Sequence, residues 1–221
     1  MKHLSKFNEM AYSAYDKEYD ILPKKILQSI AKKLNYKRFT RIGSGRYGTA
    51  FKVKGNRVVK ITKDLKEYEY AKKLKGLKNK HIADVYETYH FKYNNEKYAI
   101  IIKEFCDVSE ERMDRMIDYF LDYTKGDMSL SYISSEFLSG DISKKVLDVY
   151  FEEYKKNNAP FDLDDWYNML IELKQKNIYI SDFNGSNVGY KGDYGNDICV
   201  IELGLGYWNN IKFDEKEEIV V

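Results

Sequence analysis

Hydrophobic and polar positions along the chain recur with two different periods, which predict helices in some segments and strands in others. Between residues 21 and 34, apolar residues recur at helical spacing, with Pro23 suited to the first turn and lysines on the opposite face. We expect this amphipathic helix to pack against its own domain rather than bind a membrane, because its apolar stripe is narrow.

The next part of the chain has the pattern of a small sheet with one helix. Gly55-Asn56 is typical of a two-residue hairpin turn, and a helix is predicted over 65–77. The predicted strands cover 39–42, 50–53, 57–61, 82–91 and 97–105. A mainly helical stretch follows over 108–176, and short strands are predicted at 178–180, 188–190 and 198–201.

Composition excludes several classes of protein. The 37 basic and 35 acidic residues leave a net charge of +2, which gives no whole-molecule field for binding nucleic acid. The 2 cysteines, Cys106 and Cys199, form no pair motif, which excludes a disulfide scaffold and a cysteine-rich zinc module. No apolar run approaches the roughly 20 residues that cross a bilayer, and the first residues lack the core of a secretion signal. We therefore expect a cytoplasmic protein that binds neither membrane nor nucleic acid.

The first candidate site is a glycine-rich segment over 43–48, which lies between two predicted strands. A Rossmann site needs a helix directly after its glycines, so this context argues against one. In a hairpin, Gly43, Gly45 and Gly48 could let the backbone close over a triphosphate and point N–H groups at it. The alternative is a flexible turn without a ligand.

The second candidate is Lys60, at the end of the third predicted strand. Strand alternation puts it on the same face as Val58, so a cation and an apolar surface would lie together beneath the glycine loop. A nucleotide requires both, although a strand lysine can also be an edge residue with a buried stem. A partly buried ammonium needs a carboxylate, which Glu67 or Glu69 could supply. We favour Glu67, because apolar residues four and seven positions later share its face.

The third candidate combines Asp182, Asn187 and Glu202. Asp182 and Asn187 lie in a polar loop, where they are equally typical of a turn with side-chain hydrogen bonds. Glu202 follows an apolar strand and precedes a glycine by two positions. Carboxylate and amide oxygens are the ligands that Mg²⁺ prefers, so Asn187 and Glu202 could hold the metal against phosphate, leaving Asp182 to position a hydroxyl.

In this order, the motifs of residues 38–206 resemble the protein-kinase-like superfamily. The glycine loop is similar to the loop that covers the phosphates in that family, and Ala50 stands where valine is usual. Lys60 stands at the position of the strand lysine that contacts phosphates, with Glu67 as its helix partner. The resemblance implies that Ala50 and Val58 pack on adenine.

The later motifs continue the resemblance. The strand over 97–105 is similar to the one that leads into the adenine hinge, which implies that Glu104 and Cys106 lie beside the base. Asp182 and Asn187 keep the Asp-x-x-x-x-Asn spacing of the catalytic loop, and Glu202-Leu203-Gly204 stands in for Asp-Phe-Gly.

The resemblance implies an α+β, two-lobed protein-kinase-like fold. It has a small antiparallel sheet with one helix as the N-lobe and a mainly helical, shortened C-lobe. The expected segments are an N-terminal helical extension over 1–36, the N-lobe over 37–105 and the C-lobe with its catalytic and metal-binding loops over 106–221.

Several residues depart from the family pattern. Ile180-Ser181 replaces the His-Arg pair before the catalytic aspartate, and Asn184 replaces a lysine that steadies the transferred phosphate. Lys103 occupies the gatekeeper position behind the adenine, where it must bend away or find a carboxylate. Only 17 residues follow Gly204, which leaves no room for the usual activation segment and peptide-docking helices. An extra helical stretch over 125–160 could replace them as core packing or recruit a protein partner.

Three functions remain open at this point. The resemblance favours an atypical serine/threonine protein kinase that binds ATP with Mg²⁺ or Mn²⁺ and transfers the γ-phosphate to a hydroxyl. The departures favour a pseudokinase, a nucleotide- or partner-binding module with little or no catalysis. A small-molecule phosphotransferase would share the same site residues.

Overall fold

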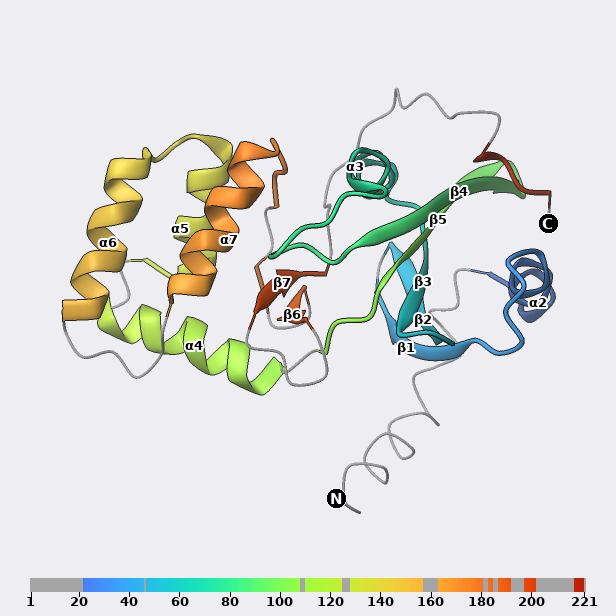
Figure 1. Cartoon of the computed structure of the whole chain (residues 1–221), viewed down its shortest axis with the longest axis horizontal. Coiled ribbons are helices and arrows are strands. Elements are labelled where there is room, and N and C mark those ends of the chain that lie inside the picture. Colours follow the sequence, from blue (N-terminus) through green and yellow to red (C-terminus); the bar gives the residue numbers. More distant parts are fainter. Residues whose placement is uncertain are drawn as a thin grey trace, which may run out of the picture.

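The computed structural model describes residues 22–45, 47–107, 110–124, 128–156, 163–180, 183–184, 187–191, 197–201 and 217–220. Within these residues the chain is an α+β protein with a five-stranded antiparallel sheet and six helices. The sheet lies at one end of the molecule and four of the helices at the other, with a two-stranded ribbon between them (Figure 1).

The large sheet contains the five strands that the hydrophobic pattern predicts over 39–105. Its strands lie in the order β1-β2-β3-β5-β4, and neighbours are antiparallel. They are β1 (Thr40–Ser44), β2 (Gly48–Val53), β3 (Arg57–Thr62), β4 (Val85–Tyr93) and β5 (Glu96–Glu104). Gly55 and Asn56 have φ values of 87° and 54°, as a tight hairpin between two twisted strands requires.

Two helices flank this sheet. Helix α2 (Lys24–Lys33) buries Ile30 against one face, together with strand residues such as Val59 and Ile100. Helix α3 (Leu65–Leu74) packs near Ile101, which points to the opposite face. The Asp64 side chain caps α3 by accepting hydrogen bonds from the backbone N–H groups of residues 66 and 67.

The helical end contains α4 (Glu110–Tyr123), α5 (Leu130–Ser139), α6 (Lys144–Lys156) and α7 (Asp164–Gln175). Trp166 of α7 is fully buried and donates a hydrogen bond from Nε1 to Ser134 Oγ on α5, at 2.9 Å. On α6, Leu147, Phe151 and Tyr154 are buried in the same core. The inward faces of α5 and α6, which lie in the stretch 125–160, therefore contribute to core packing.

The ribbon consists of β6 (Val188–Tyr190) and β7 (Ile198–Val200), close to their predicted ranges. The strand predicted at 178–180 is wrong: this segment follows α7 without pairing to another described strand. Asn177 has a φ of 53°, and Ile178 N–H bonds to the carbonyl of Leu173, which ends the helix. The segment has the alternating apolar pattern of a strand because the side chains of Ile178 and Ile180 are both buried in the helical core.

Residues 217–220 return to the large sheet and lie beside its edge strand β4 (Figure 1). Ile219 N–H donates to the carbonyl of His90 at 2.9 Å, and Glu218 forms a parallel bridge with the same residue. The Glu217 carboxylate accepts hydrogen bonds from the Tyr68 hydroxyl of α3 and, at 3.1 Å, from Thr88 of β4. This segment therefore fastens α3 to the covered edge of the sheet.

None of the helices in the described ranges combines the length and the apolar character that crossing a bilayer would take.

Candidate functional site

A buried ion pair joins β3 to α3. Lys60 Nζ lies 2.8 Å from Glu67 Oε2, and the Glu67 side chain has no exposed surface. Glu69, the alternative partner, is exposed on the same helix. Burying either charge alone would cost several kcal/mol, so the geometry of β3 and α3 is coupled through this contact.

Lys103 of β5 shares the same carboxylate. Its Nζ lies 3.5 Å from Glu67 Oε1, and its side chain is only 2% exposed. The ammonium also donates a hydrogen bond to the main-chain carbonyl of Ile201, directly after β7. Of the two outcomes expected for Lys103, bending away or finding a carboxylate, the structure shows the second.

The residues expected to contact adenine lie next to the two lysines in the sheet. Ala50 of β2 is the register partner of Lys60, and Val58 of β3 is the register partner of Lys103. Val58 is buried, whereas Ala50 is half-buried. An apolar surface and two cations therefore occupy adjacent positions on three neighbouring strands.

The three glycines of the hairpin formed by β1 and β2 differ in their surroundings. A Cβ on Gly43 or Gly45 would meet no atom within 4 Å, so the chain leaves open space there. A Cβ on Gly48 would lie 2.6 Å from the Ile61 carbonyl oxygen. The close approach of β2 to β3 therefore explains why this position is a glycine. Gly45 N–H and Gly48 carbonyl form a 2.9 Å hydrogen bond that closes the hairpin. Packing thus accounts for Gly48, and it leaves Gly43 and Gly45 available to a ligand.

The segment after β5 is held on both sides by main-chain hydrogen bonds. The N–H groups of residues 104, 105 and 107 donate to carbonyls at 2.8, 3.0 and 3.0 Å. Cys106 is buried, yet no main-chain hydrogen bond joins it to another of the described residues. Gly189 of β6 packs closely against this segment, because a Cβ added to Gly189 would lie 2.6 Å from the main-chain oxygen of Asp107.

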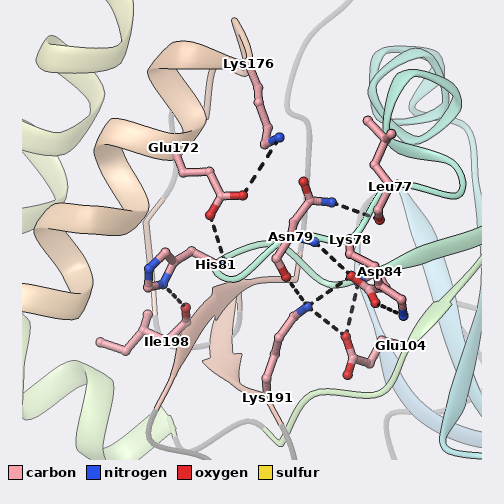
Figure 2. A network of polar contacts seen from close by, with 10 residues as sticks. All are labelled: Leu77, Lys78, Asn79, His81, Asp84, Glu104, Glu172, Lys176, Lys191 and Ile198. Carbon is pink, nitrogen blue, oxygen red and sulfur yellow. Dashed lines mark hydrogen bonds and ion pairs between the residues drawn. The ribbon is translucent and has the colours of Figure 1, made fainter.

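The side chain of Glu104 faces an ionic network rather than the ion pair of Lys60 (Figure 2). Lys191, which follows β6, lies 3.1 Å from Glu104 and 3.2 Å from Asp84, and donates to the Asn79 carbonyl at 2.6 Å. Burial alone would lower the pKa of Lys191, but hydrogen bonds to Glu104 and Asp84 raise it above its ordinary value. The network ties the two ends of the molecule together at the segment after β5.

A second set of contacts in Figure 2 attaches the connection between α3 and β4 to the helical end. His81 N–H donates to Glu172 of α7 at 3.0 Å, and its ring Nδ1 lies 2.9 Å from the Ile198 carbonyl of β7. These contacts leave the sheet and the ribbon in a defined relative position.

Asn187 is the only residue of the third candidate set that lies within the described ranges. It is buried, its N–H donates to the Asn184 carbonyl at 3.1 Å, and its own carbonyl accepts from Ile201 N–H at 2.9 Å. Asn187 is thereby bonded to the residue that Lys103 also contacts. Asp182 and Glu202 lie outside the described residues, and no cluster of three histidine, cysteine, aspartate or glutamate side chains suited to a metal occurs inside them.

Two parts of this arrangement were not foreseen from the sequence. Lys191 gave no signal, because a lysine after a short strand is ordinary. Cys106 and Cys199 lie 93 positions apart in the sequence but share a small buried cluster. A hydrogen bond to Cys106, together with burial, raises the pKa of the Cys199 thiol, so Cys199 is a neutral thiol, and both cysteines are free and buried.

The sequence matches no protein-family model, and a search of curated proteins finds no match.

Proposed function

We propose that this chain is a protein-kinase-like, ATP-dependent phosphotransferase. The observation that carries the proposal is the buried Lys60–Glu67 ion pair on β3 and α3, with Lys60 the register partner of Ala50 in β2, the strand that follows the glycine-rich hairpin. The sheet order, with one helix between β3 and β4, agrees with the N-lobe that the resemblance implies. A buried lysine whose ammonium is fixed by a carboxylate is suited to binding phosphate oxygens.

The described residues fit a nucleotide in three respects. The open space beside Gly43 and Gly45 would let the backbone N–H groups of this hairpin approach phosphates closely. Val58 and Ala50 offer apolar surface to a base, and the main chain of Cys106 forms no hydrogen bond with another of the described residues. Asn187 would supply an oxygen ligand to Mg²⁺ or Mn²⁺, which would neutralise phosphate charge when bound.

The acceptor in this proposal is a hydroxyl, in a protein serine or threonine or in a small molecule. Asp182 would accept a hydrogen bond from that hydroxyl and orient it, and Glu202 would join Asn187 as a metal ligand. Both roles rest on the sequence motifs. Positioning and charge neutralisation supply most of the catalysis in such reactions, so the absence of the usual lysine at Asn184 predicts a slow enzyme.

A pseudokinase is the second candidate, and the departures from the family pattern favour it. Ile180-Ser181 replaces the His-Arg pair before the catalytic aspartate, and Glu202 stands where an aspartate is usual. These replacements would reduce catalysis while nucleotide binding through Lys60 persists.

The decisive experiment combines nucleotide binding with phosphate transfer. Incubation with γ-labelled ATP and Mg²⁺ or Mn²⁺, with generic protein and alcohol acceptors, measures transfer by the wild-type chain and by Asp182→Asn. Melting curves with and without ATP measure binding, and saturation at 100 times the Kd stabilises by about 2.7 kcal/mol.

Lys60→Met should abolish most of this stabilisation, whereas Lys54→Met, at an exposed position in the next hairpin, should not. Transfer by the wild type and not by Asp182→Asn supports a kinase. ATP-dependent stabilisation without transfer supports the pseudokinase. No stabilisation of the wild type at millimolar ATP would refute both.

A further inference from the structure

We propose that Lys103 is a positioning residue that aligns Lys60 for phosphate binding by holding the Glu67 carboxylate and the Ile201 carbonyl. This inference rests on the proposed function and adds a residue to its site.

The position of Lys103 excludes a direct role at the surface of the site. It lies on β5 between Val58 of β3 and Val85 of β4, in the interior of the sheet. Its side chain is 2% exposed, and its ammonium contacts Glu67 and Ile201. A group so enclosed acts through the neighbours that it holds.

The geometry assigns one carboxylate oxygen to each lysine. Glu67 Oε1 faces Lys103 at 3.5 Å, and Oε2 faces Lys60 at 2.8 Å. A carboxylate held at one oxygen cannot rotate without losing that contact. Lys103 therefore limits the orientations of the oxygen that holds Lys60, and with them the positions open to the Lys60 ammonium.

The second contact extends this alignment to the helical end. Ile201 directly follows β7 and is bonded through its N–H to the Asn187 carbonyl. Lys103 thus connects β5 to α3 and to the main chain beside Asn187, so one ammonium orients the phosphate-binding lysine relative to a candidate metal ligand. A neutral apolar residue would leave both contacts unmade.

The test measures the affinity of adenosine and of Mg²⁺-ATP by calorimetry, because only the second depends on phosphate contacts. Lys103→Met should weaken ATP binding about tenfold, the range expected for loss of hydrogen bonds to a charged group, and leave adenosine binding within about twofold of wild type. Lys92→Met, at an exposed position on β4, is the matched control and should change neither. Lys103→Gln keeps a donor for the Ile201 carbonyl and replaces the Met variant if that one fails to fold.

A double-mutant cycle with Glu67→Gln distinguishes action through Glu67 from direct phosphate contact. If Lys103 acts through Glu67, Lys103→Met should weaken ATP binding less than about threefold in the Glu67→Gln background. Equal losses for adenosine and ATP, fully additive losses in the cycle, or unchanged ATP binding by Lys103→Met would each overturn the inference while leaving the proposed function intact. A wild-type chain that binds neither ligand would overturn the proposed function and this inference together.

Discussion

Replacing Glu67 by alanine should destabilise the protein strongly, because one buried carboxylate serves two buried lysines. Lys60 and Lys103 lie 2.8 and 3.5 Å from its oxygens, and their side chains are 9% and 2% exposed. Removing one partner of a buried ion pair costs about 3–5 kcal/mol, since the remaining charge stays desolvated. For a chain of this length, that loss lowers the melting temperature by roughly 6–20 °C.

Chemical denaturation monitored by circular dichroism measures the free energy of unfolding, and calorimetry measures the melting temperature. Glu69→Ala is the matched control, because Glu69 is exposed on the same helix and its loss should stay within about 0.5 kcal/mol. A loss below about 1 kcal/mol for Glu67→Ala, as for a solvent-exposed pair, would refute the coupling of both lysines to this carboxylate.

Three further substitutions test other parts of the structure. Gly189→Ala should cost about 1–3 kcal/mol of unfolding free energy by overpacking, because its Cβ would lie 2.6 Å from a backbone oxygen, whereas Gly43→Ala should keep stability and weaken only ATP binding. Lys191→Met should cost about 1–3 kcal/mol in urea unfolding, through loss of its contacts with two carboxylates and a carbonyl. Glu217→Gln should cost about 1 kcal/mol at pH 7 and less at pH 3. Burial alone would raise the pKa of Glu217, but hydrogen bonds from Tyr68 and a lysine hold it below its ordinary value. The stability that the carboxylate contributes is therefore fully present above that ordinary value and is lost as the pH falls through the lowered pKa. An equal cost at both pH values would contradict this assignment.

Local chemistry explains which parts of the fold could be predicted. Gly55-Asn56 specifies a tight hairpin through backbone conformations that few other residues adopt, and its strands were predicted to within a few residues. The wrong strand prediction at 178–180 shows what a two-residue hydrophobic period cannot predict. The period reflects which side chains are buried, and it does not show whether the backbone pairs with another strand. The packing of α2 on the sheet followed from its apolar stripe.

Contacts between distant residues account for most of what the sequence could not show. The choice of Glu67 over Glu69 followed from helix periodicity, because both candidates lie on one element. The contact of Lys103 with the Ile201 carbonyl joins residues 98 positions apart, and no local pattern encodes it. The same holds for Lys191, whose three partners come from two other segments.

The return of residues 217–220 to the edge of β4 has a consequence for how the chain folds. The hydrogen bond from Tyr68 to Glu217 spans 149 positions, and Ile219 packs beside the residues that α2 covers. Closing so long a loop is entropically costly unless the intervening helices have already become compact. Completion of the sheet should therefore wait for the helical end, and the two ends should melt in a single cooperative transition rather than as separate units.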